Sequence, residues 1–398
     1  MRILQLTSHL NVGGITTHVV NLAEALAKRG HDVVVASGGG TMVERLARGS
    51  IPHWRIPLNT SAEFSPQVAW ACCSLSRRLS RQDVQLIHAH TRVAQVVAHW
   101  LFKRHGIASV TTWHGFYRRR LSRRWFPCTG RLTIAISEPV FRHLQEEFGL
   151  AAEQIRLIPH GIEVSRFAQS VDPVETQRLR ERVRLGSNGP VVGTVARLVA
   201  AKGIAQLIEG FRHVTAEVPS AQLLVVGDGA DRAYLEQLAR RLGVADAVHF
   251  TGTLPETRVA LSLMDVFVFV PAIQEGFGLS LLEAMASRRP IVAIRRGGGA
   301  PWVLEESQVG LAVAPDDPRH LGEAVVRLLK DPPYARQLAL HGLEVVKTRY
   351  DLDRMVTQVE RVYEEAVSTT NCGLRNANCG LEDLVIQNPQ SEIRNGLQ

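Results

Sequence analysis

The stretch Glu275 to Ala286, EGFGLSLLEAMA, decides the fold of this chain of 398 residues. An apolar, strand-forming run from Val266 to Val270 precedes it, and apolar residues recur after it at helical spacing. Gly276 and Gly278 are therefore predicted to lie in a turn between a buried strand and a helix. The free N–H groups at the start of such a helix make a ready site for an anion.

Two carboxylates flank this turn: Glu275 directly precedes it, and Glu283 follows eight residues later inside the helix. An anion site between two carboxylates suits a ligand with both phosphate and hydroxyl groups, and a nucleotide sugar has both. Two alternatives remain open. The glycines can simply permit a tight turn beside a solvated Glu283. A glycosidase pair is disfavoured, because eight helical residues rise about 12 Å while paired glycosidase carboxyls lie roughly 5 to 9.5 Å apart.

The composition is that of a soluble globular protein, with 45% hydrophobic and 21% charged residues. A chain of this length is expected to form two domains, since single cores seldom grow beyond ~250–300 residues. No apolar run reaches ~18 residues, and the N-terminus has no signal-peptide layout. We therefore expect a cytoplasmic protein, either free or peripheral on the inner face of the membrane. The five cysteines include no CxxC pair, so neither a disulfide framework nor a zinc site is expected.

The positive charge is concentrated in the first half of the chain. Residues 1–165 carry 20 Lys and Arg against 10 Asp and Glu, whereas the remainder carries 26 against 28. Five arginines fall within seven residues, among aromatic side chains that include Trp125 and Phe126: Arg118, Arg119, Arg120, Arg123 and Arg124. Arginines interleaved with aromatic rings suit an anionic membrane surface. A solvated loop is the main alternative, and a nucleic-acid backbone is a weaker one.

Short apolar strands alternate with amphipathic helices in both halves, a pattern typical of parallel α/β sheets. Strands are predicted at 3–6, 33–36, 86–88, 109–112, 132–136 and 155–158, then at 190–195, 223–226, 248–250, 266–270 and 290–294. The predicted fold class is α/β, with two facing doubly wound Rossmann-like domains. In open α/β sheets ligands bind at the carboxyl ends of the strands, so we expect the site in the cleft between the domains.

The predicted boundaries follow from this alternation. Residues 1–165 form the first domain, 166–188 a charged linker and 189–349 the second domain. Residues 350–367 are predicted to form a helix that packs back toward the first domain. The tail from 368 to 398 lacks periodicity and is predicted to be disordered.

Further motifs stand at the predicted strand ends. In the second half these are GTVAR at 193–197 followed by Lys202 and Gly203, VGDG at 226–229, and FTG at 250–252. The first half has the pair Gly13 and Gly14, WHG at 113–115, and IPHGI at 158–162. Together with the E-x7-E pair Glu275 and Glu283, these motifs resemble those of the retaining glycosyltransferases of the GT-B fold, family 4 type. The resemblance runs over residues 1–365; where that family commonly has Asn, this chain has His160.

The resemblance implies roles for individual residues. It makes Glu275, Arg197, Lys202 and His114 the catalytic set. Arg197 and Lys202 would offset the charge of a nucleotide diphosphate, Glu283 would accept hydrogen bonds from the ribose, and Glu275 would meet the donor sugar. The other expected donor contacts are Gly13, Gly14, Gly227, Gly252, Gly276, Phe277, Gly278, Leu279 and Ser280.

The implied reaction moves a sugar from a nucleotide-diphosphate donor to a glycan or lipid-linked acceptor, with retention of anomeric configuration. Front-side attack needs no protein nucleophile, and neither a metal nor a cofactor besides the donor is expected. The resemblance places such an enzyme in cell-surface polysaccharide, lipopolysaccharide or glycolipid synthesis.

Other classes of α/β protein fit the sequence less well. An NAD-dependent oxidoreductase needs G-x-G-x-x-G after a strand, and the candidates at Gly227 and Gly276 both lack the third glycine. The P-loop motif is absent. A nucleic-acid-binding module would explain the arginine cluster but not the second domain, so no nucleic acid is expected as a partner.

Overall fold

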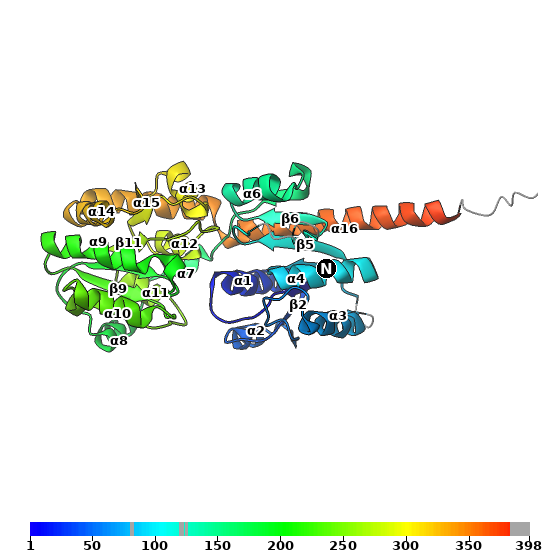
Figure 1. Ribbon diagram of the computed structural model, residues 1–398, viewed down its shortest axis with the longest axis horizontal. Coiled ribbons are helices and arrows are strands. Elements are labelled where there is room, and N and C mark those ends of the chain that lie inside the picture. Colours follow the sequence, from blue (N-terminus) through cyan, green and yellow to red (C-terminus); the bar gives the residue numbers. More distant parts are fainter. Residues whose placement is uncertain (80–82, 119–122, 124–125, 383–398) are drawn as a thin grey trace, which may run out of the picture.

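The computed structural model describes residues 1–79, 83–118, 123 and 126–382, with side chains described up to residue 370. It has two α/β domains side by side, each built on a parallel sheet (Figure 1). The predicted fold class is confirmed. Among the described residues, no helix combines the length and the apolar character that crossing a membrane requires.

The first domain contains a seven-stranded sheet in the order β3-β2-β1-β4-β5-β6-β7. Its strands are β1 (Arg2–Leu6), β2 (Asp32–Ser37), β3 (His53–Arg55), β4 (Leu86–Ala89), β5 (Ala108–Trp113), β6 (Leu132–Ala135) and β7 (Ile155–Leu157). The helices of this domain are α1 (Gly14–Lys28), α2 (Val43–Arg48), α3 (Pro66–Leu79), α4 (Arg92–His105) and α6 (Glu138–Phe148), with a 3₁₀ turn η1 (Ala152–Gln154). The inner strands β1, β2, β4, β5 and β6 are largely buried because helices cover both faces of the sheet.

The second domain contains a six-stranded sheet in the order β10-β9-β8-β11-β12-β13. Its strands are β8 (Val191–Val195), β9 (Gln222–Val226), β10 (Val248–Phe250), β11 (Val266–Phe269), β12 (Ile291–Ile294) and β13 (Leu311–Val313). The helices are α9 (Ile204–Glu217), α10 (Arg232–Arg241), α11 (Arg258–Ser262), α12 (Leu279–Ala286), α13 (Gly299–Ser307), α14 (Pro318–Lys330) and α15 (Pro332–Arg349), with 3₁₀ turns η2 (Ala200–Lys202) and η3 (Ala245–Ala247).

The segment predicted as a linker, 166–188, is largely helical. It contains the end of α7 (Val164–Ala168) and all of α8 (Pro173–Val183). Asp172 caps α8, because its side chain accepts a hydrogen bond from the Val174 N–H at 2.8 Å. Leu179 of α8 is buried in a core shared with the second domain, and α8 contacts α11. The charged residues that suggested a linker form the outer face of a packed helix.

The C-terminal helix α16 (Leu352–Glu382) runs from the junction between the domains along the first domain (Figure 1). Its buried residues, from Met355 to Ala366, join the core around β1 and α1. On its surface, Glu360 accepts a hydrogen bond at 2.7 Å from Arg29, the residue that follows α1. The helix continues beyond the predicted end at 367, so residues 368–382 are helical rather than disordered; residues 383–398 lie outside the described part of the chain.

Candidate functional site

A cavity of about 390 Å³ lies between the carboxyl ends of the two sheets. The first domain contributes the loop from Val12 to Ile15, together with His114 and His160. The second contributes the loops after β8, β9 and β11 and the start of α12. A cavity of this size, lined by apolar groups and a few convergent polar ones, is typical of a small-ligand site. The predicted cleft is therefore present.

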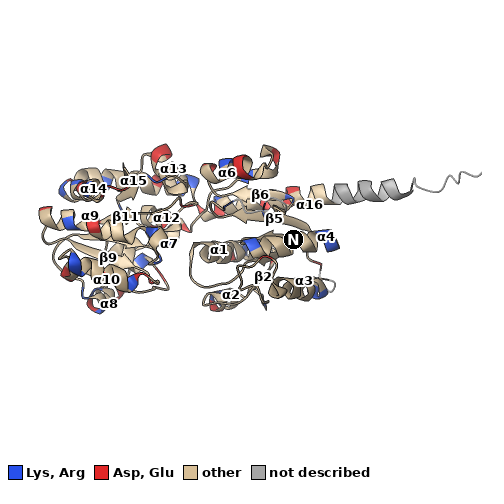
Figure 2. Ribbon diagram, in the orientation of Figure 1, with Lys and Arg blue, Asp and Glu red and all other residues tan. Residues whose placement is uncertain are grey.

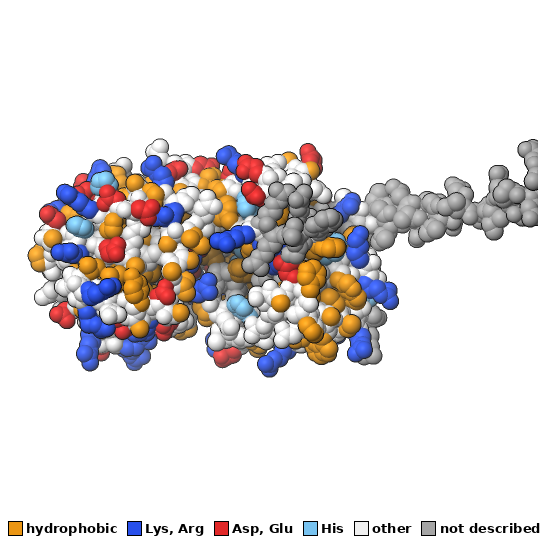
Figure 3. Space-filling model, in the orientation of Figure 1, with side chains coloured by type: hydrophobic (Ala, Val, Ile, Leu, Met, Phe, Trp, Pro, Cys, Tyr) orange, Lys and Arg blue, Asp and Glu red, His pale blue; other side chains and the backbone are white. Residues whose placement is uncertain are grey.

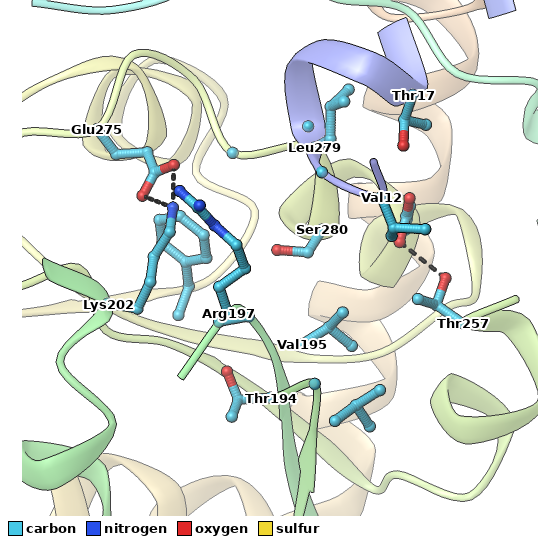
Figure 4. A pocket seen from close by; sticks show the side chains of 18 of the residues that line it. Val12, Thr17, Thr194, Val195, Arg197, Lys202, Thr257, Glu275, Leu279 and Ser280 are labelled. Carbon is cyan, nitrogen blue, oxygen red and sulfur yellow. Dashed lines mark hydrogen bonds and ion pairs between the residues drawn. The ribbon is translucent and has the colours of Figure 1, made fainter. Parts of the chain in front are cut away.

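The sequence around Gly278 places the start of α12 at this cavity. Gly278 has φ of 100°, and a Cβ there would lie 2.8 Å from the Phe269 ring of β11, so only glycine fits. The chain then enters α12 at Leu279, with Leu279 and Ser280 lining the cavity (Figure 4). The first N–H groups of a helix have no partner within it, which leaves them available to an anion.

A second helix begins on the opposite side of the cavity. The loop after β1 reaches α1 through Gly13 and Gly14, and both glycines line the cavity. A Cβ on Gly14 would lie 3.9 Å from Leu279 Cδ1, so the starts of α1 and α12 approach each other closely. Two helix N-termini therefore face one space, and both favour negative charge there.

Two cations stand beside these helix starts. Arg197 lies in the loop after β8 and is exposed, and Lys202 ends the short turn η2 that follows. The Lys202 Nζ donates to both carboxylate oxygens of Glu275, and Arg197 extends toward the same pair (Figure 4). In this state Glu275 neutralises the lysine. A diphosphate entering the cavity would compete with that carboxylate for Lys202.

Glu283 lies one turn deeper in α12. Its Oε2 accepts a hydrogen bond from Thr257 Oγ1 at 2.8 Å, and both side chains border the cavity. Burial raises the pKa of Glu283 to about 7, although the Thr257 hydroxyl and the charge of Arg166 oppose this shift. The carboxyl group therefore changes its charge near neutral pH.

Gly276 joins the two domains at the turn itself. Ser137 Oγ of the first domain donates to the Gly276 carbonyl at 2.8 Å. A Cβ on Gly276 would lie only 2.2 Å from the His114 carbonyl oxygen and 2.8 Å from Gly115 Cα. The turn that carries Glu275 is therefore held against the loop after β5.

Four histidines linked by hydrogen bonds run under the first-domain side of the cavity; His18, His90 and His160 are buried, and His114 is partly buried. His90 Nδ1 lies 3.3 Å from His114 Nε2, His114 Nδ1 lies 3.3 Å from His160 Nε2, and His160 Nδ1 lies 2.9 Å from His18 Nδ1. Burial lowers the pKa of His18 to about 4, and burial lowers the pKa of the other three well below its ordinary value. These four histidines are therefore neutral at pH 7. Both ring nitrogens of His114 face other histidines rather than the cavity.

His18, His90 and His114 bring ring nitrogens within 4.8 Å of one another, close enough to consider a metal ion. The hydrogen-bonded chain argues against such a site. A neutral imidazole has one N–H and one lone pair, so three hydrogen bonds among four histidines leave a single lone pair, on His18 Nε2 or on His90 Nε2. These two atoms are buried and have no hydrogen-bond partner within the described structure. Three of these histidines could bind one metal ion only if hydrogen bonds between them were broken.

The structure brings most of the predicted site residues to the cavity. All of Glu275, Arg197, Lys202, His114 and Glu283 line it, as do Gly13, Gly14, Gly227, Phe277, Gly278, Leu279 and Ser280. Gly252 and Gly276 do not line it. Gly252 instead accepts a hydrogen bond from the Gly227 N–H at 3.1 Å, and Gly276 supports the turn.

Sequence reasoning missed several residues that border or support the site. Thr194, Thr257 and Thr17 line the cavity, and His18 and His90 build the histidine chain. A signal for the histidines was present, since His88 and His90 alternate at the end of a predicted strand. The threonines carry no comparable signal.

The predicted arginine cluster falls largely outside the described residues, which exclude Arg119, Arg120 and Arg124. Arg118 is exposed. The Arg123 guanidinium lies 4.8 Å from the centre of the Tyr117 ring, and its Nε lies 3.7 Å from Glu63 Oε1.

Two family models match the chain, one in each domain. The model described as Glycosyltransferase Family 4 matches residues 12–166, and the one described as Glycosyl transferases group 1 matches residues 175–343. The chain is 28% identical over 400 residues to the D-inositol 3-phosphate glycosyltransferase of Acidothermus cellulolyticus, covering 90% of this chain and 87% of that protein. It is 29% identical over 381 residues to the phosphatidyl-myo-inositol mannosyltransferase of Mycobacterium leprae, covering 90% and 94%.

The fold itself has close relatives among solved structures. The structure of Anabaena Alr3699/HepE in complex with UDP-glucose matches with a TM-score of 0.80 at 21% identity, covering 92% of this chain and all of that one. Fold and site together define a glycosyltransferase of the GT-B type. The chain belongs to the family 4 type of these enzymes, the glycosyl transferases group 1.

Proposed function

We propose that this glycosyltransferase transfers a sugar from a nucleotide-diphosphate donor to a glycan or lipid-linked acceptor, with retention of anomeric configuration. One observation carries the donor assignment. The starts of α1 and α12 and the cations Arg197 and Lys202 face the same cavity, which suits a diphosphate. Glu283 and Thr257 line the same cavity, and in this proposal their side chains meet the ribose hydroxyls of the donor.

The chemistry follows from this placement. Cleavage of the anomeric C–O bond leaves negative charge on the departing diphosphate, and the helix starts and the two cations stabilise that charge. The acceptor oxygen bonds to the anomeric carbon from the same face, and its proton passes to a phosphate oxygen of the leaving group. Glu275, once Lys202 turns to the diphosphate, is free to accept hydrogen bonds from the donor sugar. The cations supply the charge that a metal would otherwise supply, so the proposal includes no metal.

The acceptor is proposed to be a lipid-linked or anionic glycan of the cell surface. The excess of basic residues in the first domain supports this choice. The Mycobacterium leprae relative is named as a phosphatidyl-myo-inositol mannosyltransferase, and this name offers a precedent for a lipid-borne acceptor.

A screen of UDP-, GDP- and ADP-sugars tests the donor assignment without knowledge of the acceptor. We expect slow release of one nucleoside diphosphate by hydrolysis, and saturable binding of that donor by calorimetry. Binding of none of these donors by the folded protein would refute the proposed function.

Donor binding should depend on pH through Glu283. With a pKa of about 7, the carboxyl is about one tenth ionised at pH 6 and about nine tenths ionised at pH 8. If the ribose binds the ionised form, donor affinity should fall about tenfold from pH 8 to pH 6. The diphosphate of a nucleotide sugar keeps its charge over this range, and the buried histidines stay neutral. Calorimetric titration with the preferred donor at several pH values measures the slope.

Variants of Glu283 separate this effect from a general pH response. Glu283→Gln should bind donor with little pH dependence. Glu283→Ala should bind it at least tenfold more weakly at pH 8, since a hydrogen bond to a charged group contributes about 1.5–3 kcal/mol. Glu217→Gln, in an exposed pair with Lys330, is the matched control and should titrate like the wild type. An unchanged slope in Glu283→Gln would remove Glu283 from the donor site.

A further inference from the structure

A second cavity, of about 540 Å³, lies within the second domain between the start of α9 and the start of α10. We call it the α9–α10 cavity. The loops that follow β8, β9, β11, β12 and β13 all contribute to its lining. These loops leave the carboxyl ends of parallel strands, which is the edge where open α/β sheets bind ligands. The reaction cavity described above does not include it.

One wall of the α9–α10 cavity is the far side of the loop that carries Lys202. Val199 and Ala200 line the α9–α10 cavity, whereas Lys202 lines the reaction cavity. The Ala272 N–H donates to the Ala201 carbonyl at 3.0 Å, so this loop is tied to the segment that leads from β11 to the donor turn. The two cavities are therefore neighbours, separated by the short turn η2.

The charged side chains around the α9–α10 cavity disfavour an anionic ligand. Of the described lining residues, Glu209, Asp231 and Asp316 are acidic and Arg296 alone is a cation, already paired with Asp316. Acidic and basic residues are interspersed over the second domain in the ribbon (Figure 2) and in the space-filling view (Figure 3), so no wider positive field offsets this local charge. Among the described residues, these carboxylates also form no group close enough to hold one metal ion. An uncharged or cationic organic ligand remains.

The unpartnered polar groups at the cavity distinguish between these two kinds of ligand. The carboxylates of Glu209 and Asp231 have no hydrogen-bond or ion-pair partner among the described residues, so they can accept from a ligand. Gln206 Nε2 and Arg296 Nε are buried donors that also lack a partner in the described structure, and both side chains line the cavity. An ammonium compound only donates and would leave these two donors unpaired, which is costly. Sugar hydroxyls donate and accept, as the hydroxyls of Ser and Thr do.

An aromatic ring completes the set. Tyr234 of α10 lines the cavity, and the residue is 50% exposed. A tyrosine at such a place offers an apolar ring face together with a polar tip. The C–H face of a sugar ring can pack on this apolar face while its hydroxyls reach the carboxylates and the amide around it. A few convergent polar groups beside an apolar surface are typical of a small-ligand site.

We propose that the α9–α10 cavity is a second saccharide site, which binds a neutral sugar unit of the acceptor glycan beside the cavity where transfer occurs. Tyr234 packs on the sugar ring, Glu209 and Asp231 accept from its hydroxyls, and Gln206 donates to them. The inference deepens the proposed function and rests on its glycan acceptor. It adds a binding site in the second domain to the donor contacts assigned there.

Saturation-transfer NMR with the full chain tests the proposal without knowledge of the acceptor. The probes are the methyl glycosides of glucose, galactose, mannose and N-acetylglucosamine at millimolar concentrations. At least one of them should receive saturation from the wild-type protein. The double variant Asp231→Ala/Tyr234→Ala should bind that glycoside at least tenfold more weakly, since it loses both a charged acceptor and the ring. Neither residue lines the reaction cavity, so this loss locates the bound glycoside.

The control is Asp246→Ala/Trp70→Ala, which also removes one carboxylate and one exposed ring. Asp246 is exposed and precedes β10, at the opposite edge of the sheet, and Trp70 of the first domain is 57% exposed. This variant should bind the glycoside like the wild type. Both double variants should keep the thermal unfolding midpoint and the donor affinity of the wild type. Tyr234→Ala alone, which removes a half-exposed side chain, gives the same test should the first double variant not fold.

Several outcomes would overturn the proposal. These are saturation of none of the four glycosides, equal losses in both double variants, and wild-type glycoside binding by Asp231→Ala/Tyr234→Ala. Binding of spermidine in place of the glycosides, lost in the same variant, would assign the cavity to a cation instead. A protein that binds a glycoside here but no nucleotide sugar would refute the proposed function alone, and one that binds the donor but no glycoside would refute this site alone.

Discussion

Replacing Lys202 with alanine should lower the rate constant of donor turnover by ~10² or more, as loss of one preorganised donor does in other enzymes. The charge that develops on the leaving diphosphate would lose its closest flexible cation, and Glu275 would lose its partner. Arg197→Ala should have an effect of similar size, because the two side chains approach the same point (Figure 4). Steady-state release of nucleoside diphosphate, measured over a range of donor concentrations, gives kcat and KM separately.

Lys330→Ala is the control for this experiment. Lys330 also forms an ion pair, with Glu217 at 2.7 Å, but it lies on the exposed surface far from the cavity. It should leave kcat and KM unchanged. If Lys202→Ala raises only the donor KM and keeps kcat near that of the wild type, Lys202 binds the ground state and stabilises no leaving charge.

The turn at Gly276 and Gly278 could be predicted from the sequence because the residues that determine it are close together in the chain. An apolar strand, two glycines and a helical period occur within about twenty residues, and Gly278 has the positive φ that its position requires. The helix begins at Leu279, directly after the predicted turn. The alternation of strands and helices likewise predicted both parallel sheets, since buried parallel strands have continuous apolar runs.

The interactions between distant segments could not be predicted in this way. The pairing of Lys202 with Glu275 joins residues 73 positions apart, and the histidine chain joins residues up to 142 positions apart. His90, His114 and His160 follow β4, β5 and β7, and these strand ends lie at one edge of the sheet only because of the strand order. No local sequence pattern specifies that order. The helix α8 within the predicted linker could not be predicted for a related reason, because its single buried leucine, Leu179, gives almost no apolar period.

Gly276→Ala should reduce kcat/KM for the donor by ~10² or more while the protein remains folded. The added Cβ would lie 2.2 Å from the His114 carbonyl oxygen, which is backbone and cannot rotate away. The turn would have to move off the first domain and carry Glu275 with it. A displacement of about 1 Å at a reacting centre is enough for a loss of this size.

Gly115→Ala provides the matched control, because the same contact is approached from the opposite side. A Cβ on Gly115 would lie 3.9 Å from the Gly276 backbone, an ordinary van der Waals distance. This variant should therefore keep kcat/KM within a few-fold of the wild type. Thermal unfolding should show similar midpoints for both variants, since the clash acts between the domains and not within either core. Equal activity of the two variants would mean that the close contact at Gly276 is not required for turnover, and that the domains react from a more open arrangement.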